Sequence, residues 1–75
     1  MKIVIGIPAY NEEKNIAGII TKLKKHADSI IVCDDGSTDL TREISEKLGA
    51  IVISHPKNRG YGAAINSLFL KAREL

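Results

Sequence analysis

The sequence predicts an α/β domain in which parallel strands alternate with helices. Three short runs rich in β-branched residues are each followed by a segment whose apolar residues recur at helical spacing. Strands that alternate with helices imply parallel pairing through crossover helices. Because such crossovers are right-handed, we expect the first two helices to share one face of the sheet. We expect the strand order 3-2-1, as in half of a doubly wound fold.

The first strand–helix unit occupies the first third of the chain. The strand is predicted over Lys2–Ile7, a nearly continuous β-branched run that ends at Pro8. The helix is predicted over Glu12–Lys25, with isoleucines at helical spacing on one face and lysines on the other. Asn11 is expected to be its N-cap, and Glu13 is interpreted as favouring the helix start through the helix dipole.

Two further units follow in the same order. Their elements are expected at Ser29–Cys33, Asp39–Leu48, Ala50–Ser54 and from near Tyr61 to the end of the chain. In the second helix Leu40, Ile44 and Leu48 form the apolar stripe, and Gly49 suits the residue after the helix. The broad apolar face of the third helix is made of Ala63, Ala64, Ile65, Leu68, Phe69 and Ala72. Residues 1–75 are therefore predicted to form a three-layer, Rossmann-like half (βαβαβα) without an internal domain boundary.

Composition and charge narrow the function classes. With 75 residues the chain is one small domain at most. Its net charge is +2, with acids and bases mixed along the chain, so the charge pattern does not indicate nucleic-acid binding. The single cysteine, Cys33, is expected to be a small buried hydrophobe and rules out a disulfide within the chain. We expect a cytoplasmic protein, because neither a signal peptide nor a membrane-spanning stretch is visible.

The three segments after the strands are polar and chemically distinct. They read Pro8–Glu13, Asp34–Asp39 and Asn58–Gly62, whereas the connections at the other edge, around His26–Asp28 and Gly49, look plain. In an open parallel sheet, ligands bind beyond the carboxyl ends of the strands. The sequence therefore predicts a binding site at this edge.

Two adjacent carboxylates, Asp34 and Asp35, follow the second strand. Side by side they repel each other, so a bound partner would relieve them: a ribose diol, a base N–H or a hard cation. The structural alternative is that one of them caps the second helix or closes an Asx turn before Gly36.

The first and third loops offer other ligand-binding groups. Tyr10 suits stacking on a base or ribose, with a half-buried loop aromatic as the alternative. Glu12 suits a hydrogen bond to base or ribose, or simply the helix start. Arg59, Gly60 and Gly62 resemble a phosphate site at a helix N-terminus, although glycines also serve tight turns and close packing.

The two histidines indicate no chemistry in the sequence. His26 and His55 have no cysteine or second histidine at metal-binding spacing, so both are interpreted as ordinary surface or loop residues. There is also no Ser–His–Asp order or nucleophile elbow that would favour hydrolysis.

Together the three loops resemble glycosyltransferase family 2. The segments Ile7–Glu13, Val32–Asp39 and Asn58–Ile65 are similar to three family signatures, in order and each after its own strand. The third segment is similar to the branch of dolichyl-phosphate (polyprenyl-phosphate) mannosyl- and glucosyltransferases. The resemblance covers the whole chain and implies the N-terminal part of a GT-A fold.

The resemblance also implies site residues. The positions that match the nucleotide-binding positions of the family are Pro8, Ala9, Tyr10 and Glu12. Asp34 and Asp35 match the pair of which one contacts the base or ribose, and the Arg59–Gly62 loop, with Gly60, matches the segment near the diphosphate. No residue of this chain matches a catalytic or metal-binding position.

The implied activity is transfer from a UDP- or GDP-sugar to an acceptor, which in this branch is often a polyprenyl phosphate at the cytoplasmic face of a membrane. Mg²⁺ or Mn²⁺ would neutralise the leaving diphosphate in the full-length enzyme, where the Asp-x-Asp ligands follow the next strand. This chain is expected to supply nucleotide binding without transfer. Because the first strand would have a bare edge, we also expect the isolated chain to self-associate.

Other classes fit less well. A stand-alone nucleotide-binding or regulatory α/β module would bind nucleotide without transfer. A dinucleotide-dependent oxidoreductase would need Gly-x-Gly-x-x-Gly after the first strand, where this chain has Pro8-Ala9-Tyr10-Asn11. A receiver-like signalling domain would need an aspartate after the third strand, where Ser54-His55-Pro56 stands instead.

Overall fold

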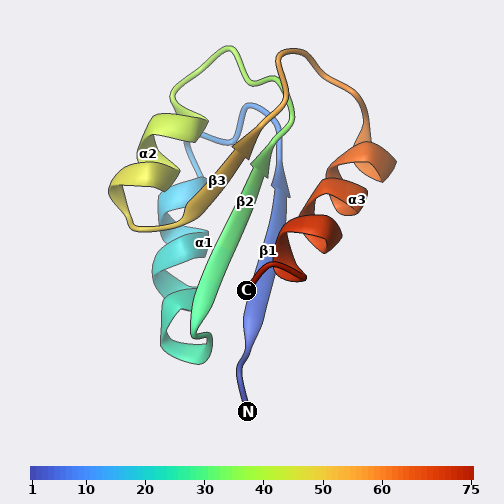
Figure 1. Ribbon diagram of the computed structural model, residues 1–75. Helices are drawn as coiled ribbons and strands as arrows, with labels where there is room; N and C mark the ends of the chain where they lie inside the picture. The colour runs from blue at the N-terminus through green and yellow to red at the C-terminus, as the bar shows by residue number, and fades with distance from the viewer.

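The computed structural model describes residues 1–75 as three layers, with a parallel sheet between helices (Figure 1). The strands are β1 (Val4–Ala9), β2 (Ser29–Asp34) and β3 (Ile51–Ser54). The helices are α1 (Ile16–Leu23), α2 (Thr41–Lys47) and α3 (Tyr61–Ala72), and a 3₁₀ turn, η1 (Lys24–His26), follows α1. Both strand pairs are parallel and the order is β1-β2-β3, which confirms the predicted fold and strand order.

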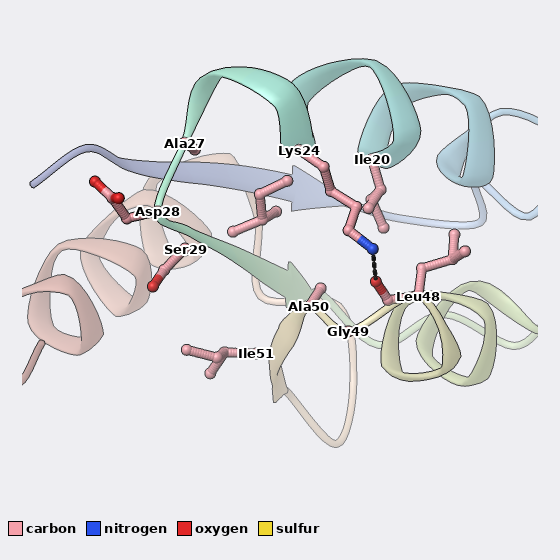
Figure 2. A pocket seen from close by; sticks show the side chains of 10 residues that line it. Ile20, Lys24, Ala27, Asp28, Ser29, Leu48, Gly49, Ala50 and Ile51 are labelled. Carbon is pink, nitrogen blue, oxygen red and sulfur yellow. Dashed lines mark hydrogen bonds between the residues drawn. The ribbon is translucent and has the colours of Figure 1, made fainter.

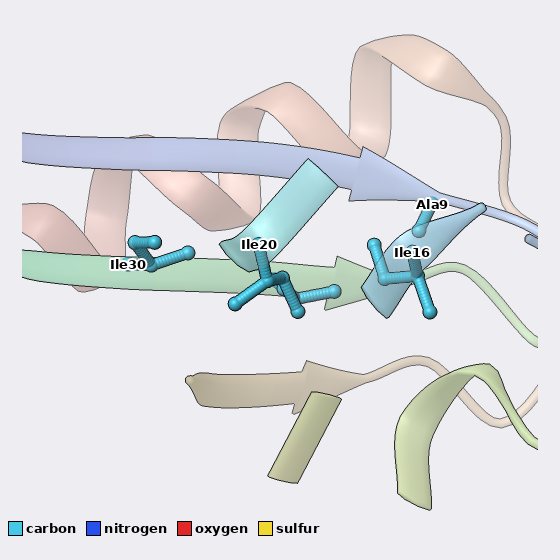
Figure 3. Close-up of a cluster of buried hydrophobic side chains, with 5 residues drawn as sticks. Ala9, Ile16, Ile20 and Ile30 are labelled. Carbon is cyan, nitrogen blue, oxygen red and sulfur yellow. The ribbon is translucent and has the colours of Figure 1, made fainter. Parts of the chain in front are cut away.

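The central strand β2 is buried on both faces, which explains its continuous apolar sequence. Ile30 and Val32 pack with Ala9, Ile16 and Ile20 beneath α1 and α2 (Figure 3). The alternate residues of β2 face α3, where Ile31, Cys33, Ala64 and Leu68 form a second cluster. This division follows from the two-residue period of a strand. Full burial of one such aliphatic side chain contributes about 1.5–3 kcal/mol to stability.

Strand β1 runs through Pro8 to Ala9, so the prediction that Pro8 ends it is wrong. Pro8 is in register with Cys33, and Ala9 with Asp34. Proline is tolerated because β1 is an edge strand and pairs on one side only. The extra length brings Tyr10 and Asp35 to the same end of the sheet.

Helix α1 begins at Ile16, four residues later than predicted, and Asn11 is not its N-cap. Asn11 has a positive φ of 51°, and its side-chain oxygen accepts a hydrogen bond from the N–H of Thr38. Glu13 also lies outside the first turn of α1, and its carboxylate accepts from the N–H of Leu40. The side chains that were expected to start the helix therefore accept hydrogen bonds from N–H groups in and after the second loop instead.

The other helices agree better with the expected ranges. Ile44 and Leu48 pack against the core under α1, but Leu40 precedes α2 and is 55% exposed, so it is not part of the apolar stripe. Helix α3 begins at Tyr61 as predicted and buries Ala64 and Leu68. Its apolar face is narrower than expected, because Phe69 is 70% exposed. None of the helices has both the length and the apolar character needed to cross a bilayer.

The amino-terminal edge of the sheet serves to connect the elements. A pocket of about 290 Å³ lies there (Figure 2), and across it the ammonium of Lys24 donates to the carbonyl of Leu48 at the end of α2, at 2.9 Å. Gly49 has a φ of 89° and ends α2 as expected. The carboxylate of Asp28 accepts from the N–H of Ile3 at 2.7 Å. The polar groups at the amino-terminal edge of the sheet thus join chain segments to one another.

Candidate functional site at the carboxyl ends of the strands

Three loops converge where the strands end, at the arrowhead edge of the sheet in Figure 1. They follow Ala9, Asp34 and Ser54, the last residues of β1, β2 and β3. Because the strands are parallel and adjacent, their carboxyl ends meet at one edge. The middle loop lies between the other two and hydrogen-bonds to both.

Reciprocal hydrogen bonds tie the first loop to the second. The N–H of Asn11 donates to the hydroxyl of Ser37 at 2.8 Å, while the N–H of Thr38 donates to the side-chain oxygen of Asn11 at 2.9 Å. The N–H of Glu12 donates to the hydroxyl of Thr41 at 2.8 Å. These bonds join residues 26 to 29 positions apart, and they fix the path of the chain after β1.

Asp39 extends this contact between the loops. One of its oxygens accepts from the N–H and hydroxyl of Thr41, at 2.9 and 2.6 Å, and the other accepts from the N–H of Glu13 at 3.2 Å. Burial acts to raise the pKa of Asp39, but the bonds from Thr41 and Glu13 outweigh it and lower that pKa. Thr41 is fully buried, so its hydroxyl has no water to replace these partners.

Asp35 ties the second loop to the third. Its side chain accepts from the His55 ring at 2.6 Å, from the N–H of Arg59 at 2.9 Å and from the N–H of Gly60 at 2.9 Å. The hydrogen bond from His55, followed by that from Arg59, lowers the pKa of Asp35. Asp35 is therefore a carboxylate at neutral pH, although it is only 5% exposed.

His55 lies in the loop after β3, as one of the two interpretations had it, but it is buried and not an ordinary surface residue. It is 6% exposed, and its Nε2 lies 2.8 Å from the hydroxyl of Ser67 and 3.7 Å from the sulfur of Cys33. Asp35, His55 and Ser67 thus form a hydrogen-bonded chain that the sequence order did not indicate. Cys33 is buried as predicted, and burial, with Asp35 and Asp34 nearby, raises its pKa.

Asp34 and Asp35 do not act as a pair. Successive residues at a strand end point to opposite faces of the sheet. The side chain of Asp34 accepts from the N–H of Ser37, three residues on, at 3.3 Å, which is a local bond but neither the Asx turn nor the helix cap considered as alternatives. Asp34 lines a polar pocket beside α2, whereas Asp35 lines a different pocket beside α3.

The pocket beside α3, of about 320 Å³, is the candidate ligand site. It is lined by Pro8, Ala9, Tyr10, Asp35, Asn58, Gly60, Tyr61 and Ala64. Five of these were candidates from the sequence, and they come from all three loops. Asn58, Tyr61 and Ala64 were not candidates, although a tyrosine directly after Gly60 at a helix start was a visible signal. Tyr10 and Tyr61 are 48% and 73% exposed.

Four candidate residues from the sequence do not line this pocket: Asp34, Glu12, Arg59 and Gly62. Glu12 acts through its backbone, since its carbonyl accepts from the N–H groups of Asn15 and Ile16 at the start of α1. Arg59 and Gly62 flank Gly60 and Tyr61 at the start of α3.

The start of α3 presents free donors. The N–H groups of Tyr61, Gly62 and Ala63 have no acceptor within the chain, as expected for the first turn of a helix. Such N–H groups and the helix dipole attract anions. Gly60 reaches this start with a φ of 97°, a conformation that favours glycine.

The residues of this chain do not assemble a metal site. No group of three or more His, Cys, Asp or Glu side chains lies close enough together to hold a metal ion. Asp34 and Asp35 line different pockets. A divalent cation would need ligands from other residues.

Fold and loops together define the class: the first half of a doubly wound α/β domain, with a pocket beyond the carboxyl ends of its strands. Residues 4–74 match the model of the family described as glycosyl transferase family 2. The chain belongs to this family.

Relatives and solved structures agree with this assignment. The UDP-N-acetylglucosamine–dolichyl-phosphate N-acetylglucosaminyltransferase of Methanococcus voltae is 37% identical, over 97% of this chain and 36% of its own length. The dolichyl-phosphate hexose transferase of Haloferax volcanii is 38% identical, over 93% of this chain and 30% of its own.

A solved structure shows the same fold. Glucosyl-3-phosphoglycerate synthase from Mycobacterium tuberculosis, in complex with Mn²⁺ and UDP-glucose, superposes with a TM-score of 0.74 at 33% identity. The match covers 85% of this chain and 27% of that one. The chain thus spans about a third of the length of these proteins, and its fold is the N-terminal part of a GT-A glycosyltransferase fold.

Proposed function

We propose that residues 1–75 form the nucleotide-binding part of a glycosyltransferase domain that takes its sugar from a UDP- or GDP-sugar. The observation that carries this proposal is the pocket in which Tyr10, Asp35 and Gly60, from three different loops, meet beside the free N–H groups of α3. Membership of glycosyltransferase family 2 supports the reaction class.

Each part of the pocket suits one part of a nucleotide. The exposed faces of Tyr10 and Tyr61 suit a base, because aromatic stacking tolerates any base. The Asp35 oxygen that accepts only from the N–H of Gly60 keeps acceptor capacity for a ribose hydroxyl or base N–H. Arg59 and the N–H groups at the start of α3, including that of Gly62, suit the diphosphate.

The whole protein would supply what this chain lacks. We propose Mg²⁺ or Mn²⁺ as the cation, since a solved relative contains Mn²⁺ beside UDP-glucose. Its ligands would come from other residues of the whole protein. When bound, the cation would neutralise charge on the leaving diphosphate. Two relatives are named for dolichyl phosphate, which supports a polyprenyl phosphate acceptor and a place at the cytoplasmic face of a membrane.

Titration with UDP and GDP, followed by backbone amide shifts, tests the site. We expect the largest shifts at Ala9, Tyr10, Gly60 and Tyr61. Tyr10→Ala should weaken binding by about 1–3 kcal/mol through lost stacking, whereas Tyr10→Phe should retain it. Shifts confined to the opposite edge, around Asp28 and Gly49, would overturn the proposal.

A further inference from the structure

His55 and Ser67 have no part in the proposed contacts with nucleotide, but they form a hydrogen-bonded chain that ends on Asp35, which does. His55 bonds Asp35 through Nδ1 at 2.6 Å and Ser67 through Nε2 at 2.8 Å. His55 and Asp35 are both nearly inaccessible to solvent, so neither ring nitrogen relies on water. A buried polar group held on both sides has a fixed orientation.

The partners dictate the arrangement of protons. A carboxylate only accepts, so Nδ1 of His55 must carry a proton and donate it to Asp35. In a neutral ring Nε2 is then an acceptor, and the hydroxyl of Ser67 donates to it. This ring tautomer is the one that gives Asp35 a donor.

Asp35 in turn determines where the third loop lies. One of its oxygens accepts from both His55 and the N–H of Arg59, and the other accepts from the N–H of Gly60. The segment between β3 and α3 has no regular structure, and Lys57, Asn58 and Arg59 are exposed. The Asp35 carboxylate therefore anchors the end of this segment next to the first turn of α3.

We propose that His55 is a positioning residue of the nucleotide pocket: held by Ser67, it orients the Asp35 carboxylate, which fixes the backbone N–H groups of Arg59 and Gly60 and thereby places Gly60 in the lining of the pocket. The inference rests on the proposed function for its consequence, which is nucleotide binding. Its structural part, the fixing of Arg59 and Gly60, is measurable in the free chain.

A hydrolytic role for the same three residues does not fit. Ser67 lies in the middle of α3, where the backbone N–H groups are used in helix hydrogen bonds. No pair of free N–H groups faces its hydroxyl to stabilise an oxyanion, which acyl transfer needs.

Matched substitutions separate the two sides of the ring. The amide of Asn replaces Nδ1, so His55→Asn keeps a donor for Asp35. The longer Gln places its amide near Nε2, so His55→Gln reaches Ser67 and not Asp35. His55→Leu removes both bonds. Hydrogen exchange of the Arg59 and Gly60 amides reports the anchor, UDP titration reports the pocket, and ¹⁵N shifts of the His55 ring report its tautomer.

We expect His55→Gln and His55→Leu to speed exchange at Arg59 and Gly60 by about tenfold or more, as the loss of one buried hydrogen bond allows. UDP binding should weaken by a similar factor. His55→Asn should restore both to within about threefold. The wild-type ring should carry a proton on Nδ1.

The inference is overturned if His55→Gln leaves both amides as protected as in wild type, or if the ring carries its proton on Nε2. Cleavage of p-nitrophenyl acetate that disappears in Ser67→Ala would also overturn it in favour of catalysis. Failure of the wild type to bind UDP would contradict the proposed function alone, because amide exchange still decides the anchoring role of His55.

Discussion

The side chain of Asp35 accepts three hydrogen bonds from the protein, whereas the side chain of its neighbour Asp34 accepts one, from the N–H of Ser37. The sequence identified both as candidates but could not assign their roles. The period of a strand predicts that adjacent side chains diverge, and that much was available without a structure. His55, the first partner of Asp35, was not, because a single histidine after a strand carries no local signal of burial.

The lowered pKa of Asp35 makes a prediction about acid stability. A carboxyl whose pKa is lower in the folded state than its usual value of about 3.9 stabilises the fold above that value, and this contribution is lost as pH falls through the folded pKa. Asp39, whose pKa is also lowered, adds in the same direction. We expect the urea midpoint to fall between about pH 5 and 3, and to fall less in Asp35→Asn.

Urea unfolding of both proteins at several pH values checks this. Asp39 remains in the variant, so some loss of stability should persist. Equal losses in wild type and Asp35→Asn would show that the Asp35 carboxylate is not coupled to folding.

At the scale of elements, the strands and helices follow local patterns, but contacts between loops decide where they begin. The first loop gives the side chains of Asn11 and Glu13 to the second loop, and α1 starts four residues late. The hydrogen bonds concerned join residues 26 to 29 positions apart. No local propensity reports such partners, so the sequence pattern favoured a conventional helix start.

Thr41 tests the contact between the first and second loops. Thr41→Val keeps the shape of the side chain but leaves the N–H of Glu12 without its acceptor. We expect a loss of about 1–3 kcal/mol in the free energy of unfolding, the cost of an unsatisfied part-buried donor. Thr21→Val, at an exposed position of α1, is the control and should stay within about 0.5 kcal/mol. Similar values for the two variants in urea unfolding would contradict this role.

Gly36 marks the crossing of the second and third loops. It has a φ of 79°, and a Cβ there would lie 2.4 Å from the backbone N of Asn58 and 2.4 Å from the carbonyl carbon of Lys57. Because backbone must move, Gly36→Ala should cost more than about 2 kcal/mol.

A second glycine provides the control for this prediction. Gly18 is an exposed residue of α1, and nothing lies within 4 Å of a Cβ placed there. Gly18→Ala should therefore stabilise the chain by up to about 1 kcal/mol. Thermal or urea unfolding compares the two, and a neutral Gly36→Ala would mean that the loops do not cross as described.

In the whole molecule the central strand is buried, but the edge strand β1 has a free side. β1 pairs on one side only, and beside it α3 exposes Phe69, at 70%. Between the sheet and α3 lies an apolar groove. Its lining residues are Val4, Gly6, Ile31, Ile65, Leu68, Phe69 and Ala72. Free strand edges next to apolar surface favour pairing with another chain.

We predict that the 75-residue chain self-associates through the free edge of β1 and the apolar groove beside it. Sedimentation over a range of concentrations should show oligomers, and Phe69→Lys should shift them toward monomer. Leu40→Lys is the control, because Leu40 is an exposed apolar residue that lies outside this groove. A monomer at all concentrations, or equal effects of both variants, would contradict the prediction.

The sequence by itself determined the α/β class, the parallel order of the strands and the placing of three polar loops at one edge. Periodicity carries this information, because it specifies which face of each element is buried. Only the tertiary structure decided that β1 passes through Pro8, that Asp35 and not Asp34 lines the pocket beside α3, and that His55 is buried between Asp35 and Ser67. The physical reason is that these features depend on hydrogen-bond partners brought together from distant parts of the chain by the packing of the sheet.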